Sequence, residues 1–221
     1  ANAITLAQLQ AVVGANAINA NLTAYQLAIA GNNAGTLSTA ALIRTLVDTV
    51  NAAITEINAA ANNTNAANAI TLYQLQTVVG DDAISANLPA YQLAIAVKFA
   101  GTLSTAEPIQ TLVDAANTNA TTAITAINAA ANNTNAITLA QLQAVVGADA
   151  INANLAVYRL AIFNAGTDTL STAAPIQNLV DTANTNATNE ITNINTAAGN
   201  TSAANAITLA QLQAVVGANA I

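Results

Sequence analysis

A short apolar segment recurs four times along the chain and sets its organisation. The sequence ITLAQLQAVVG, or a version that differs at two positions, begins at four isoleucines: Ile4, Ile70, Ile137 and Ile207. Further blocks related to AYQLAIA, TLSTA and LVD recur between these segments in a constant order. A regular period of this kind is typical of repeat proteins. The sequence therefore predicts repeats over residues 1–67, 68–134 and 135–204, with the start of a fourth repeat over 205–221.

The two ends of the chain carry the same sequence. Residues 1–18 and 204–221 both read ANAITLAQLQAVVGANAI, and the other copies differ from it. A longer protein with a superperiod of three repeats, of which this chain is a window, would produce this match, and so would a recent duplication of one repeat. We favour the first explanation, and we expect the array to continue.

The longest segment of each repeat has the apolar spacing of a helix. In the first repeat the apolar positions advance by four and three residues in alternation: Ile43, Val47, Val50, Ile54, Ile57 and Ala61. This spacing places them on one helix face, whereas a half-buried strand would alternate by two. We expect this helix to begin at Ser38 or Thr39. In the second repeat Ser104 to Glu107 has capping-box spacing, and Pro108 is tolerated in a first turn.

Two shorter helices precede the long one. In the first repeat, the first short helix runs from Thr5 as N-cap to Gly14 at its end. In the second repeat, the second short helix begins near Asn87, because Pro89 prevents a much earlier start. Breaks are expected in three Asn-rich joints, residues 62–65, 132–135 and 199–202. Parts of these joints could instead be turns of a continuing helix. The expected fold is all-α, with tandem three-helix-bundle repeats (short, short, long) stacked into an elongated array. A β-solenoid is the main rival, and the helical spacing disfavours it.

The second and third repeats contain four additional residues within the long helix. The insertion follows Asp114 and Asp181, relative to Asp48 in the first repeat. Because four residues are close to one helical turn, the apolar face should survive the insertion.

Composition removes most chemistry from consideration. The chain has no His, Cys, Met or Trp, and only 6% of its residues are charged. Imidazole catalysis, thiol chemistry and Cys/His zinc sites are therefore excluded. The net charge of −7 argues against nucleic acid and anionic membrane surfaces as partners, and no apolar run is long enough for a membrane span. We predict no catalytic, cofactor-binding or metal-binding residues, no cofactor and no enzyme activity.

Two sets of recurring polar residues are candidate sites. The first set follows each LV pair: Asp48, Asp114 and Asp181. Each is isolated within its repeat, whereas calcium requires several oxygen ligands, so a solvent-exposed face explains them better. The second set follows the first helix: Asn16, Asp82, Asp149 and Asn219. Because Asn and Asp interchange there, we interpret these residues as caps rather than as metal ligands.

Recurring tyrosines and glutamines are candidates for recognition or for structure. The tyrosines are Tyr25, Tyr91 and Tyr158, which we interpret as core anchors whose hydroxyls reach polar partners. The glutamines are either exposed or bonded between repeats: Gln8, Gln74, Gln141 and Gln211. Asn-x-Ser/Thr sequences occur at Asn21, Asn62, Asn119, Asn132, Asn186 and Asn200. Several are expected by chance in a chain this rich in Asn and Thr, so they carry little weight as glycosylation sites.

The order ITLAQLQAVVG, AYQLAIA and LIRTLVDTVNAAI resembles the helical repeats of very large bacterial surface proteins of the adhesin type, which in turn resemble three-helix GA modules. This resemblance implies a bundle-like repeat, a secreted or cell-surface location, and a role in adhesion or as a spacer. It does not imply albumin binding, because no binding residue matches one for one.

The leading hypothesis is the structural repeat region of an extracellular bacterial stalk, fibre or adhesin. Its signal and anchor would lie outside this chain, and its partner would be itself, in a head-to-tail or longer array. The alternative is an array of binding modules that presents helical faces to a host protein, a glycan or a surface. Residues 205–221 supply only the first helix of a fourth repeat, so we expect four of its apolar residues to lack a cover: Leu209, Leu212, Val215 and Val216.

Overall fold

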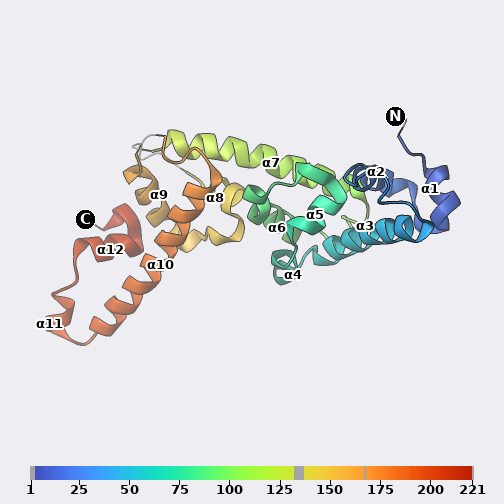
Figure 1. Ribbon diagram of the computed structural model, residues 1–221. Helices are drawn as coiled ribbons and strands as arrows, with labels where there is room; N and C mark the ends of the chain where they lie inside the picture. Colours follow the sequence, from blue (N-terminus) through green and yellow to red (C-terminus); the bar gives the residue numbers. More distant parts are fainter. Residues whose placement is uncertain (1–2, 132–136, 167, 221) are drawn as a thin grey trace. The chain divides into compact units, whose positions relative to one another are not determined.

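All regular secondary structure is helical in the part of the chain that a computed structural model describes, residues 3–131, 137–166 and 168–220 (Figure 1). No strand occurs within these ranges. The chain forms two compact units, Ala1–Asn117 and Thr118–Ile221. The boundary between these units falls inside one long helix, whereas the expected repeat boundary at 134/135 and the Asn-rich joint at 132–135 lie outside the described residues.

The first unit contains six complete helices and the start of a seventh (Figure 1). They are α1 (Leu6–Val13), α2 (Leu22–Ala30), α3 (Ala40–Ala60), α4 (Thr64–Asn68), α5 (Leu72–Val79), α6 (Leu88–Ala96) and α7 (Ala106–Ala129). The second unit continues α7 and adds α8 (Leu139–Val146), α9 (Leu155–Asn164), α10 (Ala173–Ala197), α11 (Thr201–Ala204) and α12 (Leu209–Val216).

The recurring ITLxQLQxVVG segment forms the same capped helix at each of its four positions. In α1, Thr5 is the N-cap, and a capping box joins it to Gln8, with Thr5 N–H donating to Gln8 Oε1 at 2.8 Å. The helix ends before Gly14, whose φ of 66° is costly for any residue with a side chain. The predicted bounds of this helix are confirmed, and a short 3₁₀ turn begins at the glycine in each copy.

The long helices also follow the prediction. α3 begins after Thr39, whose side chain accepts the Leu42 N–H. α3 has 21 residues, α7 has 24 and α10 has 25, so the longer helices absorb the inserted residues. Pro108 and Pro175 both lie in first turns, where a missing N–H removes no helical hydrogen bond.

The described Asn-rich joints contain short helices of their own, which the sequence analysis did not predict. α3 ends at Ala60, and Asn62 then adopts a φ of 62°. Asn63 starts the new helix α4 by accepting the Ala66 N–H at 3.1 Å. Asn200 starts α11 in the same way. A residue with positive φ, Asn62 in one joint and Gly199 in the other, therefore follows the long helix, and the next asparagine caps the short helix.

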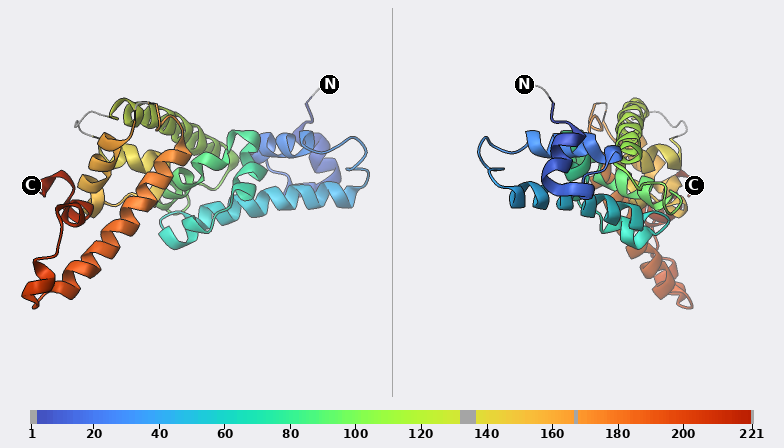
Figure 2. Two further views of the ribbon diagram at one scale, coloured as in Figure 1. Left: turned by 60° about the vertical axis from the view of Figure 1, so that its left-hand side comes forward. Right: turned by 90° about the vertical axis from the view of Figure 1, so that its right-hand side faces the viewer.

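The core of the first unit lies along α3. The apolar face of that helix is buried at Val47, Val50, Ile54 and Ile57, as its spacing predicts. α1, α2 and α5 all pack on α3, and α5 also packs on α2 (Figure 2). The first helix of the second repeat therefore helps to cover the second and third helices of the first repeat.

In the second unit α10 has the corresponding place. α8, α9 and α12 pack on it, and α12 also packs on α9. Both views in Figure 2 show the C-terminal part of α10 continuing to α11 beyond the other helices of this unit. Among the described residues, no helix combines the length and apolar character needed to cross a membrane.

Candidate functional site

The recurring carboxylates are exposed and bond to amide side chains. Asp48 accepts a hydrogen bond from Asn16 Nδ2 at 3.1 Å. In the second repeat, Gln110 Nε2 donates to both Asp82 and Asp114, each at 2.9 Å. Gln177 bridges Asp149 and Asp181 in the same way. The structure thus brings together two sets of residues that the sequence analysis treated separately, because they lie on different elements.

These carboxylates do not gather into larger groups. Within residues 3–131, 137–166 and 168–220, the structure contains no cluster of three or more His, Cys, Asp or Glu side chains that could hold a metal ion. The amide bridges instead satisfy the carboxylates in pairs.

The capping interpretation of Asn16, Asp82 and Asp149 is wrong. Each is the last residue of a 3₁₀ turn, and none of the three side chains accepts a backbone N–H of a helix among the described residues. Their side chains bond to the long helix instead, and their backbone carbonyls accept hydrogen bonds from elsewhere in the repeat. For example, Asn16 O accepts the Asn51 Nδ2 donor at 2.9 Å. Asn16 donates to the long helix through its amide nitrogen, whereas the carboxylates of Asp82 and Asp149 accept from a glutamine of that helix. Either residue type can therefore make this contact, which explains why Asn and Asp interchange.

The recurring tyrosines are fully buried at the centre of a polar network, which confirms their interpretation as core anchors. Tyr25 Oη donates to Asn51 Oδ1 at 2.6 Å, and Asn21 Nδ2 donates to the same oxygen at 3.1 Å. Tyr25 Oη also accepts the Ile18 N–H at 3.4 Å. The network ties the start of α2, the preceding turn and α3 together.

The same network recurs in the other two repeats. Tyr91 bonds to Asn117, and Tyr158 bonds to Asn184. The sequence analysis missed the asparagines of this network. A signal was present, since Asn51, Asn117 and Asn184 each follow the aspartate of the LVD block by three residues.

We predict that Asn51→Ala destabilises the first unit by about 2–3 kcal/mol, because it removes the acceptor of both Asn21 Nδ2 and Tyr25 Oη. A buried polar group left without its partner costs roughly 1–3 kcal/mol. Native-state hydrogen exchange of α2 and α3 amides measures this loss. Thr55→Ala is the matched control on α3, because its hydroxyl bonds only to the Asn51 carbonyl at an exposed site. An equal effect of both substitutions would contradict the network.

Within the described ranges, three asparagines and two glutamines make hydrogen bonds between repeats. Asn21 Oδ1 accepts the Ala106 N–H at 3.1 Å, and Asn58 Oδ1 accepts the Leu103 N–H at 3.0 Å. In the second unit Asn128 Oδ1 accepts the Leu170 N–H at 3.2 Å. Gln74 and Gln211 take part in capping boxes and also donate to glutamates of the preceding long helix, Glu56 and Glu190.

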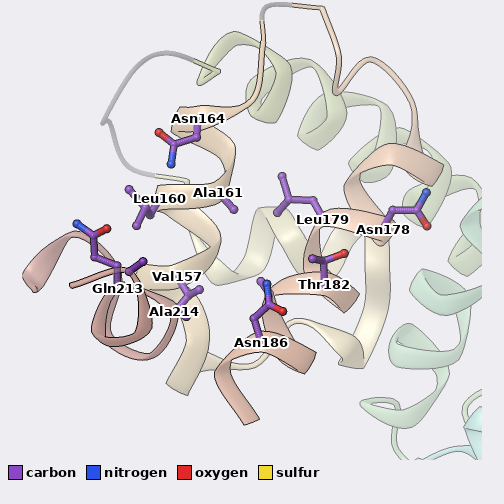
Figure 3. Close-up of a pocket in the computed structure, with 12 residues that line it drawn as sticks. Val157, Leu160, Ala161, Asn164, Asn178, Leu179, Thr182, Asn186, Gln213 and Ala214 are labelled. Carbon is purple, nitrogen blue, oxygen red and sulfur yellow. The ribbon is translucent and has the colours of Figure 1, made fainter. Parts of the chain in front are cut away.

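A groove recurs beside these joints. In the second unit it lies between α9, α10 and α12, and its lining includes Leu160, Leu179 and Gln213 (Figure 3). The equivalent residues Leu27, Leu46 and Gln76 line a groove between α2, α3 and α5 in the first unit. The groove of the first unit has Tyr73 at its rim, with 71% of the tyrosine's surface exposed. The equivalent residue in the groove of the second unit is Ala210.

Most of the described Asn-x-Ser/Thr positions are exposed: Asn62, Asn119, Asn186 and Asn200. Asn21 is buried, and its amide nitrogen bonds to Asn51, so a glycan there is incompatible with the folded first unit. Asn132 lies outside the described residues.

The described candidate sites offer apolar contact, amide and hydroxyl hydrogen bonding, and paired exposed carboxylates. This chemistry suits interactions between helical surfaces. Comparisons of the chain with protein-family models, with curated proteins and with solved structures find no match.

Proposed function

We propose that this chain is a non-catalytic structural repeat region of an extracellular bacterial stalk, fibre or adhesin. In this proposal each repeat is a unit of two short helices and one long helix, and successive repeats stack into an elongated array. The repeats span residues 1–67, 68–134 and 135–204, with a fourth starting at 205.

The observation that carries the proposal is the joint between the first two repeats. α5 packs on α2 and α3, and two asparagines of the first repeat accept backbone N–H groups of the second. Repeats that bury surface and form hydrogen bonds only with their neighbours add stability along one dimension. The contact therefore suits a protein whose length, rather than an active site, matters to its role.

The surface chemistry supports an extracellular setting. Only 6% of the residues are charged, and the exposed faces of the long helices are rich in Thr and Asn. The resemblance to repeats of bacterial surface proteins points the same way.

Small-angle X-ray scattering on the 221-residue chain tests the proposal. A compact globule of this length has a radius of gyration of about 17 Å. We expect a clearly larger value and a pair-distance distribution with a long tail. Scattering that matches a compact globule would refute the stacked array.

The alternative function is an array of binding modules, and the recurring groove favours it. Leu27 and Tyr73 expose apolar surface beside Gln76 in the first unit, which suits a host protein or glycan with an apolar face. The test compares the natural chain with Tyr73→Ala for binding to such a host protein or glycan. Loss of binding in Tyr73→Ala, with an unchanged X-ray scattering curve, would support this function.

A further inference from the structure

The second copy of the recurring helix differs from all three other copies at three positions. Tyr73, Thr77 and Asp81 stand where each of the other copies has alanine. The positions are spaced four residues apart, so Tyr73 and Thr77 share one face of α5, and Asp81 follows them in the next turn. All three residues line the groove between α2, α3 and α5. The departures from the repeat are therefore concentrated on one surface.

The fold does not require these three side chains. α1, α8 and α12 form the same capped helix with alanine at the corresponding positions. In the groove of the second unit, for example, Ala214 takes the place of Thr77 (Figure 3). The ring of Tyr73 is 71% exposed and therefore contributes little to packing. An exposed aromatic ring beside apolar surface is typical of a site that binds another molecule.

The groove has the size and the apolar surface of a small-ligand site. Its volume is about 820 Å³, and small-molecule sites typically have volumes of roughly 300–1,000 Å³. Leu27 of α2 and Leu46 of α3 both line it and are incompletely buried. Together with the ring of Tyr73 they provide apolar contact from three helices. The groove can therefore accept a ligand that has an apolar face.

The threonines of the groove present acceptor oxygens. The hydroxyls of Thr45, Thr49 and Thr77 donate to backbone carbonyls of their own helices, at 3.1, 2.8 and 2.8 Å. A hydroxyl oxygen that has used its proton in this way still accepts hydrogen bonds, and the ionised carboxylate of Asp81 only accepts them. A ligand that matches these groups must supply several hydrogen-bond donors.

The charge of the groove restricts the ligand further. Among the described residues that line the groove, Asp81 alone is charged, so the groove disfavours an anion. A single ammonium group would pair with Asp81 but would not reach acceptors on both α3 and α5. A neutral sugar carries hydroxyl donors around its ring and also has an apolar C–H face. It therefore matches the spaced acceptors and the aromatic surface together.

We propose that the groove between α2, α3 and α5 is a binding site for a neutral glycan. The ring of Tyr73 stacks on the C–H face of one sugar unit, and Thr77 and Asp81 accept hydrogen bonds from sugar hydroxyls. Leu27 and Leu46 contact the apolar parts of the glycan. This inference rests on the alternative function above, to which it gives a ligand class and a defined site, and it does not require an elongated array.

A triple variant that restores the three alanines removes the proposed site. With Tyr73→Ala, Thr77→Ala and Asp81→Ala together, residues 70–82 read the same as residues 137–149, so we expect α5 to form as α8 does. Both chains are applied to an array of neutral glucose, galactose and mannose oligosaccharides beside sialylated galactosides. We expect the natural chain to bind neutral glycans and the triple variant to lose this binding.

Single substitutions measure the contribution of the ring. For the neutral glycan with the strongest array signal, we expect Tyr73→Ala to raise the Kd measured by isothermal titration calorimetry by at least about tenfold. Phe99→Ala is the matched control, since Phe99 is 80% exposed and is not among the residues that line the groove. Its Kd should equal that of the natural chain. Equal effects of the two substitutions would overturn the inference.

Tyrosine fluorescence reports contact with the ring directly. The chain has no Trp, and of its four tyrosines, all of which the structure describes, only Tyr73 is exposed. Acrylamide in solution should therefore quench mainly the emission of Tyr73. We expect the bound neutral glycan to reduce this quenching, and an unchanged quenching curve at saturating glycan would contradict stacking on the ring.

The remaining outcomes separate this inference from the functions on which it depends. Absence of binding to every neutral glycan on the array, or equal binding of the sialylated galactosides, would overturn the glycan site. Binding of a lysine-rich peptide that Tyr73→Ala weakens, without glycan binding, would refute the glycan site and keep the alternative function as a protein-binding site. X-ray scattering of the same chains tests the elongated array independently of any ligand.

Discussion

Tyr91→Ala should lower the stability of the first unit by about 3–5 kcal/mol, the range for removing a fully buried aromatic ring. The ring of Tyr91 is 0% exposed, and its hydroxyl bonds to Asn117 and accepts the Ile84 N–H at 3.2 Å. The substitution therefore leaves a cavity and disrupts the polar network together. Hydrogen exchange of the amides in α6, under native conditions, measures the change.

Two further substitutions separate the contributions to this effect. Tyr91→Phe keeps the ring and removes only the hydroxyl, and we expect a loss of about 0.5–1.5 kcal/mol. Asp114→Asn changes an exposed side chain and should stay within about ±0.5 kcal/mol. A larger effect at Asp114 than at Tyr91 would mean that the core and solvent faces are wrongly assigned.

Gly217→Ala should detach α12 from the second unit. The backbone of Gly217 has φ 62° and ψ −143°, a conformation that costs a residue with a side chain about 1–3 kcal/mol. A Cβ atom at Gly217 would also collide with the backbone carbonyl of Ala156 in α9. We expect the amides of α12 to lose their protection from hydrogen exchange.

Gly14→Ala is the matched control for this collision. Gly14 has nearly the same backbone angles, φ 66° and ψ −144°, and lies within an identical stretch of sequence. A Cβ atom there meets nothing within 4 Å. The cost at Gly217 should exceed the cost at Gly14 by at least about 1 kcal/mol, the lower end of the range for overpacking. Equal losses of protection in α1 and α12 would show that backbone strain alone acts, and that α12 does not dock on α9 through this turn.

Local sequence signals predicted the helices well. Thr5 and Gly14 bound α1 as expected, and Thr39 caps α3. The three-four spacing of Val47, Val50 and Ile54 identified the buried face of α3. The short helices α4 and α11 were missed because the helix-breaking residues Asn62 and Gly199 stand directly before the asparagines that cap the next helix.

The polar networks were predicted less well, because their members are far apart in the sequence. Asn51 was not singled out, although it bonds to both Asn21 and Tyr25. The pairing of Asp82 with Asp114 through Gln110 joins a turn to a helix. No short-range pattern indicates such a contact, because it depends on how α7 lies against that turn.

The sequence by itself determined the repeat, the bounds of helices such as α1 and the apolar face of α3, since periodicity, capping and glycine conformation act over a few neighbouring residues. Only the tertiary structure decided which of those faces are covered. Leu142 and Leu212 occupy the same position in the same helical sequence, yet one is buried and the other is 39% exposed. Burial depends on the neighbouring helices that surround a segment. Two segments with the same sequence can therefore differ in burial, and their own residues do not reveal the difference.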